Sequence, residues 1–166
     1  MSRFRDALDR IVFARGYTTR LLDTIDPADW FRMPAEGVTH VAWQVGHLAM
    51  AQYRLCFERV RGIRPDDEQL LPAAFLKTFG RDSVADPDAT NYPPPPVIRA
   101  TFDRVHERVL AELPAHPDAD LDASPLTPHM LCTSKIDCVR WCSAHEMVHA
   151  GQIGLLRRLF GLRPMW

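Results

Sequence analysis

The sequence predicts an all-α protein, a four-helix bundle with long connections after its second and third helices. Four stretches repeat apolar residues at steps of three and four, which is the pattern of a helix with one buried face. Proline, glycine and aspartate gather between these stretches, and none of the chain has the alternation of a strong strand. Because 166 residues with 46% hydrophobic and 25% charged side chains are ordinary for one domain, we expect a single domain over residues 1–166.

The first two helices are expected over residues 2–25 and from residue 40 to about residue 62. An apolar stripe that starts at Phe4 supports the first helix, and Pro27 prevents its continuation. Thr39 can cap the N-terminus of the second helix, because its hydroxyl can accept a hydrogen bond from a free backbone N–H. The segment between the two helices contains aromatic residues that predict an apolar turn over one end of the core.

The third helix is expected over residues 97–113 and the last helix over residues 134–161. Ser134 and Asp137 have the spacing of a capping box at the start of the last helix. Gly161 stands where a left-handed C-cap residue belongs.

Two long connections separate these helices. Residues 62–96 form the longer one, in which residues 68–79 have the pattern of a short helix. Because structureless connections of this length are uncommon in compact domains, it either shapes a pocket or simply carries the chain across the bundle. The other connection spans residues 115–133, in which His116 and His129 are expected to be exposed.

The last helix carries two histidines, His145 and His149. Residues four apart share one face of a helix, about 6 Å apart at the backbone, so both imidazoles can reach one metal ion. The segment also matches the H-E-x-x-H pattern of zinc peptidases, in which the glutamate, here Glu146, is the general base. That interpretation is disfavoured because no His, Asp, Glu or Cys follows His149, and no strand pattern supplies the sheet edge that such enzymes need.

A third ligand is available upstream. His47 lies inside the second expected helix, and the last helix reads H-x-x-x-H-x-G-Q. This combination resembles the DinB-like (YfiT-like) family of metal-binding four-helix bundles. The resemblance covers nearly the whole chain, in helix lengths, in the long second connection and in the closing LLRRLFGLRP. The residues that carry it are His47, His145, His149, Gly151 and Gln152.

The resemblance implies a metal site made of His47, His145 and His149. It also implies a homodimer, to which the apolar segment 155–166 either contributes a contact or adds only core packing within one monomer. Family members with assigned activities include transferases and isomerases that use low-molecular-weight thiols, and some hydrolases.

Four further residues are candidates for the pocket or for contacts that support the ligands. Gln152, one turn beyond the histidine pair, either orients a ligand or bound water, or fixes a helix contact. His106 is either a fourth ligand or a residue on the bundle surface, and His40 is either exposed at a helix start or at the pocket mouth. Cys142 is either a further ligand or, like Cys138, a small buried residue.

Charge and hydropathy disfavour several classes of protein. A formal net charge of -1 provides no basic footprint for nucleic acid or anionic lipid. No apolar run approaches the roughly 20 residues that span a bilayer, and the charged start MSRFRDALDR does not resemble a signal peptide. We therefore expect a cytoplasmic protein with reduced cysteines that binds neither nucleic acid nor membrane.

Three histidine ligands favour an open, catalytic metal site. Imidazoles suit zinc, nickel, copper or iron, with zinc or nickel the leading candidates here, and three protein ligands leave a position for solvent or substrate. The leading hypothesis is an enzyme in which a divalent metal ion activates a thiol or water against a small electrophilic substrate. The alternative is a non-catalytic, metal-binding stress-response bundle. Because neighbouring helix residues point about 100° apart, Glu146 is expected to face away from the metal, and the sequence assigns no catalytic residue.

Overall fold

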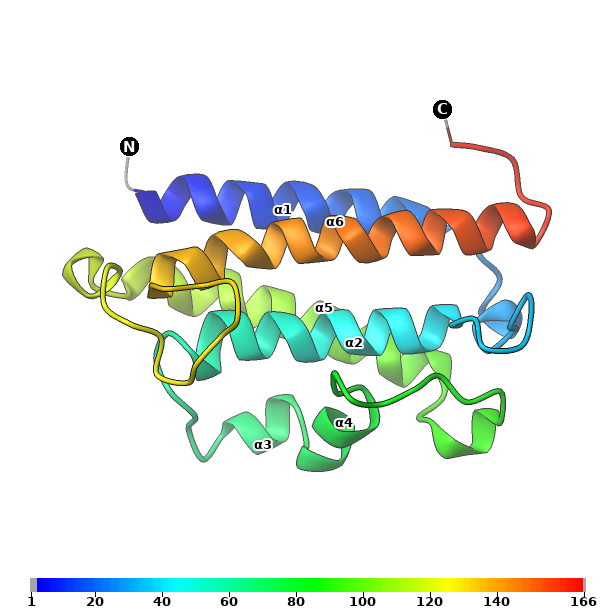
Figure 1. Ribbon diagram of the computed structural model, residues 1–166, viewed down its shortest axis with the longest axis horizontal. Coiled ribbons are helices and arrows are strands. Elements are labelled where there is room, and N and C mark those ends of the chain that lie inside the picture. Colours follow the sequence, from blue (N-terminus) through cyan, green and yellow to red (C-terminus); the bar gives the residue numbers. More distant parts are fainter. Residues whose placement is uncertain (1–2, 166) are drawn as a thin grey trace.

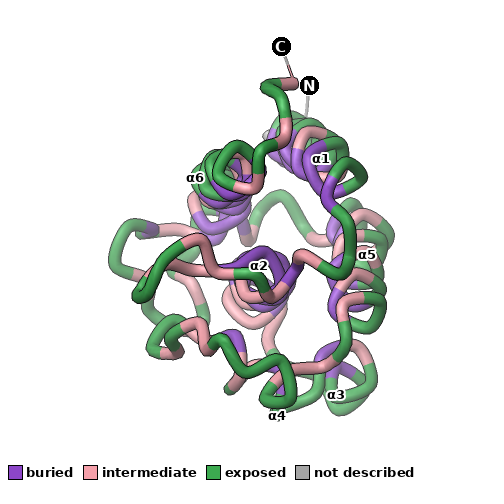
Figure 2. Tube along the Cα trace, turned by 90° about the vertical axis from the view of Figure 1, so that its right-hand side faces the viewer, coloured by how far each residue is buried: buried purple, intermediate pink, exposed green. Residues whose placement is uncertain are grey.

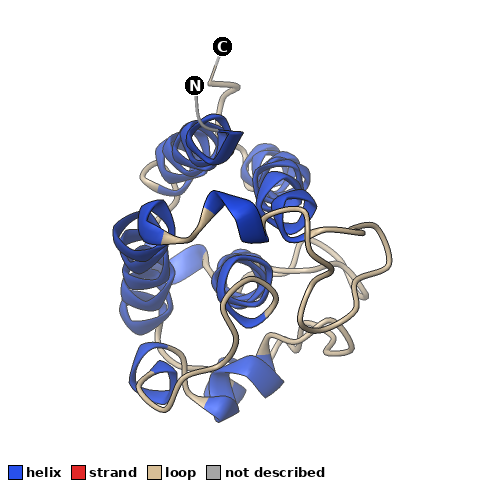
Figure 3. Cartoon of the chain, turned by 90° about the vertical axis from the view of Figure 1, so that its left-hand side faces the viewer, coloured by secondary structure: helices blue, strands red, loops and turns tan. Residues whose placement is uncertain are grey.

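The computed structural model describes residues 3–165, with side chains from residue 4 onward, and this part of the chain is helical without any strand (Figure 3). An all-α fold with four long helices is thus confirmed. The long helices are α1 (Arg3–Leu22), α2 (Val41–Tyr53), α5 (Pro95–Glu112) and α6 (Lys135–Leu159). The expected start of the first helix at residue 2 lies outside the described residues. Within them, no helix combines the length and the apolar character that crossing a membrane requires.

The long helices pack in two parallel pairs. Helices α1 and α6 lie side by side and run in one direction, whereas α2 and α5 run in the opposite direction (Figure 1). Helix α2 also contacts α6 and lies in the middle of the molecule (Figure 2). Its sequence, VAWQVGHLAMAQY, has no charged residue, and every residue except Trp43 is buried, as expected for a helix that is apolar on all sides.

Local signals predicted the ends of α6 correctly. Ser134 Oγ accepts a hydrogen bond from Asp137 N at 3.3 Å, and Asp137 Oδ2 accepts one from Ser134 N at 3.1 Å. This is the expected capping box. At the other end, Gly161 has a φ of 90°, a conformation that glycine adopts without a steric penalty.

The start of α2 differs from the expectation. His40 caps the helix in place of Thr39, because His40 Nδ1 accepts a hydrogen bond from Trp43 N at 3.0 Å. His40 Nε2 donates to Asp86 O at 3.1 Å, so both ring nitrogens have partners. The ring is fully buried, which corrects the expectation of an exposed residue at the helix start.

The long connection after α2 begins with a π turn, Arg54–Glu58, and then forms two short helices. These helices are α3 (Asp67–Leu70) and α4 (Ala73–Thr78), which together replace the single short helix expected over residues 68–79. Pro72 separates them, because a residue before proline avoids the helical conformation and Leu71 is accordingly extended (φ -145°, ψ 94°).

Candidate metal centre

His47 of α2 meets His145 and His149 of α6 in a single cluster. Each residue offers one ligand atom, and these atoms all lie within 4.8 Å of one another. The Nε2 atoms of His145 and His149 are 3.2 Å apart. The centroid of the His47 ring is 5.3 Å from that of His145 and 4.8 Å from that of His149. The three histidines expected from the sequence thus form a group that is able to hold a metal ion.

Two of the three rings are oriented by hydrogen bonds at Nδ1. His47 Nδ1 donates to Phe79 O at 2.9 Å, and His149 Nδ1 donates to Gln44 Oε1 at 2.5 Å. Gln44 Nε2 in turn donates to Thr39 Oγ1 at 3.0 Å, which fixes the amide oxygen toward His149. With the proton on Nδ1, each ring keeps an unprotonated Nε2 for a metal ion, the usual arrangement around metal-binding histidines.

Gly46 allows the connection after α2 to approach the helix closely. A Cβ atom at position 46 would lie 2.3 to 2.5 Å from three ring atoms of Phe79, so only glycine leaves room for this aromatic ring. Because Phe79 supplies the carbonyl that orients His47, this close contact also positions a candidate ligand. The expectation that this connection shapes the site, rather than merely crossing the molecule, fits this arrangement.

Burial keeps the three imidazoles neutral near pH 7. Burial first, and then the neighbouring histidines, lower the pKa of His145 to about 4 and that of His149 to about 3. Burial also lowers the pKa of His47. A metal ion binds the neutral imidazole. The three histidines are already neutral at pH 7, so none of them has to release a proton before a metal ion binds.

The geometry fits a small divalent ion. Two nitrogen ligands about 2.05 Å from a tetrahedral ion are separated by roughly 3.3 Å, close to the distance between the two Nε2 atoms in α6. Three imidazoles are also the donor set that zinc and nickel accept readily. The residues present therefore fit the metal that the sequence predicts.

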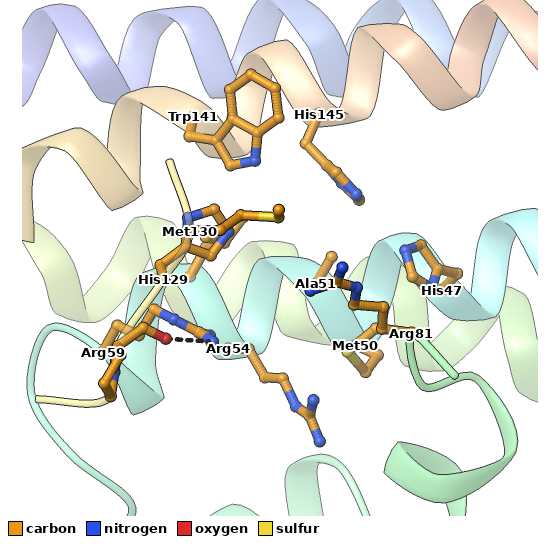
Figure 4. Close-up of a pocket in the computed structure, with 12 residues that line it drawn as sticks. His47, Met50, Ala51, Arg54, Arg59, Arg81, His129, Met130, Trp141 and His145 are labelled. Atoms are coloured by element: carbon orange, nitrogen blue, oxygen red, sulfur yellow. Dashed lines mark hydrogen bonds between the residues drawn. The ribbon is translucent and has the colours of Figure 1, made fainter. Parts of the chain in front are cut away.

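The cluster opens into a pocket of about 180 Å³ that His47 and His145 both line (Figure 4). Its walls come from α2, α6 and both long connections. They combine apolar side chains, a histidine and three arginines, chiefly Met50, Met130, Trp141, His129, Arg54, Arg59 and Arg81. His129 is only partly exposed and faces this pocket, which corrects the expectation of a solvent-exposed loop residue. His116 is also only partly exposed.

The other candidate residues from the sequence are not part of the histidine cluster. His106 Nδ1 is 3.2 Å from Gln52 Nε2, and His106 is not part of the group that is able to hold a metal ion. Gln152 is exposed, and the support expected from it comes instead from Gln44. Cys142 is buried, as is Cys138, in agreement with the interpretation of both as small buried residues.

Glu146 faces away from the cluster, as its position on the helix predicts. Its Oε1 accepts a hydrogen bond from Arg15 Nε of α1 at 2.9 Å, and both side chains are almost fully buried. The carboxylate that would be the general base in a zinc peptidase is therefore paired with Arg15.

The fold and the site define a class: an all-helical protein whose three-histidine cluster opens into a pocket. Residues 10–153 match the DinB superfamily, a stretch that includes all three histidines and most of the chain. The chain therefore belongs to the DinB superfamily. A comparison with curated proteins found no match.

Proposed function

We propose that this protein is a metal-dependent enzyme in which His47, His145 and His149 hold a divalent zinc or nickel ion. In this proposal the four long helices act as a four-helix bundle with the site between α2 and α6. The observation that carries the proposal is the pocket that two of the three histidines line, because it gives a small molecule access to the metal position.

A bound divalent ion would supply an electrophilic centre that lowers the pKa of a coordinated thiol or water. A thiol is the first candidate, because its ordinary pKa of about 8.5 lies far below that of water, and coordination ionises it outright. A small electrophilic substrate would lie in the same pocket, within reach of the thiol sulfur. Thiol-dependent transfer is therefore the leading reaction, and hydrolysis of a small substrate is the second.

The chain's own residues orient and shield this chemistry. Phe79 O and Gln44 Oε1 hold the rings of His47 and His149 so that each Nε2 is available. Trp141 and Met130 form apolar parts of the pocket wall, which reduce local hydration and so strengthen electrostatic interactions at the site.

Elemental analysis of the untagged protein tests the metal site. We expect about one divalent ion per chain in the wild type and loss of that ion in both His47→Ala and His145→Ala. His116→Ala is the matched control, because His116 pairs with Asp120 at 2.8 Å and is not part of the cluster. Retention of the ion by His47→Ala, or its absence from the wild type under every loading condition, would contradict the proposal.

We further propose that the protein acts as a homodimer in the cytoplasm. Exposed apolar side chains on α1 and α6, among them Phe13 and Leu155, support a contact between two copies. Light scattering coupled to gel filtration distinguishes a dimer from a monomer, and Phe13→Asp is expected to shift a dimer toward the monomer.

A further inference from the structure

Three arginines line the pocket beside the histidine cluster. Arg54 begins the π turn at the end of α2, Arg59 follows that turn, and Arg81 lies in the connection after α4. Figure 4 shows all three around the pocket that also contains His47 and His145. Residues from separate segments of the chain thus bring three positive charges to one small cavity.

The π turn accounts for the presence of both Arg54 and Arg59. Side chains five residues apart on a regular α-helix point about 140° apart and cannot face one cavity. Here Arg59 N donates to Arg54 O at 3.1 Å, the i to i+5 hydrogen bond of a π-helix, which makes the turn wider than that of an α-helix. The local irregularity therefore turns the second arginine toward the same pocket as the first.

The charge on these arginines is poorly compensated within the chain. Arg54 Nε is 3.6 Å from Glu58 Oε2, and Glu58 also accepts a hydrogen bond from Thr127. Within the described residues, the Arg59 guanidinium has only a 3.4 Å contact to Pro128 O, and its Nε is buried without a hydrogen-bond partner.

Arg81 is exposed and forms no hydrogen bond or salt bridge with any residue in the described part of the chain. No Asp or Glu among the described residues lines the pocket. The cavity therefore has positive charge and unused N–H donors that an anion can satisfy.

His129 lines the same pocket and is affected by two of these arginines. Burial lowers the pKa of His129, and the charges of Arg59 and Arg81 lower it further. Arg59 and Arg81 are thus close enough to His129 to act on it electrostatically.

We propose that this pocket selects small organic acids, with Arg54, Arg59 and Arg81 binding a carboxylate while the reactive group of the molecule extends to the three histidines. Guanidinium groups bind carboxylates through paired, charge-assisted hydrogen bonds. The apolar wall residues and the volume of about 180 Å³ suit a short carbon chain between these two ends. This inference rests on the proposed function and names the substrate class of that site. The carboxylate belongs either to the thiol or to its electrophilic acceptor.

A pair of matched thiols tests the first source. Cobalt-loaded protein is titrated with 3-mercaptopropionate and with the neutral 3-mercapto-1-propanol, and thiolate binding is followed by the near-ultraviolet charge-transfer band of cobalt. We expect half-saturation at about tenfold lower concentration for the acid, as charge-assisted hydrogen bonds imply. Arg81→Gln and Arg59→Gln should each reduce this preference at least threefold, whereas Arg104→Gln, an exposed residue of α5, should not change it.

Calorimetric titration with maleate and with its neutral diamide tests the second source. These titrations use both metal-loaded and metal-free protein, so that the pocket is tested even when no metal binds. A preference for 3-mercaptopropionate assigns the carboxylate to the thiol, and a preference for maleate alone assigns it to the acceptor. Equal binding of acids and neutral analogues in every titration would overturn the inference, as would a preference that both arginine variants retain in full. Absence of cobalt binding would instead contradict the proposed function, and absence of a charge-transfer band with either thiol would contradict its thiol-dependent form.

Discussion

Replacing Gly46 with alanine is expected to disturb the fold and the metal site together. The added Cβ would lie 2.3, 2.4 and 2.5 Å from Cδ1, Cε1 and Cγ of Phe79, whereas ordinary contacts begin near 3.4 Å. Phe79 is fully buried, so its ring has to retreat by about 1 Å into packed surroundings. Because Phe79 O accepts the hydrogen bond from His47 Nδ1, the retreat also displaces a candidate metal ligand.

The expected loss of stability follows from two opposing terms. Forcing an extra methyl group into a packed core costs about 1 to 3 kcal/mol. The higher helix propensity of alanine than of glycine offsets about 1 kcal/mol of this cost. We expect a net loss of up to about 2 kcal/mol, which lowers Tm by up to roughly 8 °C in a chain of this size. Loss of the bond that orients His47 is expected to weaken metal binding about 10-fold or more.

Denaturant unfolding followed by circular dichroism measures the first effect, and competition with a chromophoric chelator measures the second. Gly151→Ala is the matched control, because a Cβ at Gly151 meets no atom within 4 Å. This control should gain up to about 1 kcal/mol and keep its metal affinity. A Gly46→Ala variant as stable as the wild type, with unchanged metal affinity, would refute the reasoning.

Three further changes test other parts of the structure. Gln44→Leu removes the acceptor of His149 Nδ1 and should weaken metal binding about 10- to 100-fold in the chelator competition; unchanged affinity would argue against this supporting role. Glu146→Gln leaves Arg15 buried without its charged partner and should lower the free energy of unfolding by about 3 kcal/mol. The metal content of Glu146→Gln should not change, whereas a loss would indicate that Glu146 acts at the metal. Burial, and then the charge of Arg15, lower the pKa of His106 from 6.5 to about 3. As pH falls below 6.5, His106 is therefore protonated in the unfolded chain before it is protonated in the folded one, and the free energy of unfolding decreases. In metal-free protein, His106→Gln should lose about 1 kcal/mol less stability than the wild type between pH 7 and pH 5, after allowance for partial exposure of the ring; equal losses in denaturant titrations would refute this.

Features with local causes could be predicted from the sequence. The capping box of Ser134 and Asp137 depends on residues three apart, and Gly161 acts on its own backbone, so both ends of α6 agree with expectation. The pairing of His145 with His149 likewise needs only the helical repeat. His47 lies far away in sequence, and the family pattern rather than helix periodicity connected it with this pair.

Features with non-local causes could not be predicted. Gln44 contacts His149 only because α2 and α6 pack in one particular rotation, and no spacing in the sequence encodes that rotation. Gln152 follows His149 closely in sequence but lies on the exposed side of α6. His40 replaced Thr39 as the cap because an imidazole nitrogen can also accept a backbone N–H, an option that the usual preference for hydroxyl caps does not indicate.

The glutamate of the HEMVH segment shows how the rotation of α6 is fixed. Arg15 of α1 binds Glu146 of α6 at 2.9 Å, Phe102 O of α5 at 2.8 Å and Gln52 Oε1 of α2 at 2.7 Å. One buried guanidinium thus contacts all four long helices. Buried charges are costly to leave unpaired, so a rotation of α6 that separates Glu146 from Arg15 is strongly disfavoured. Because His145 precedes Glu146 and points about 100° away, the same constraint directs the histidine toward α2. Glu146, the residue that resembles a peptidase base, therefore helps to position the candidate metal site by fixing the orientation of α6 from its opposite side.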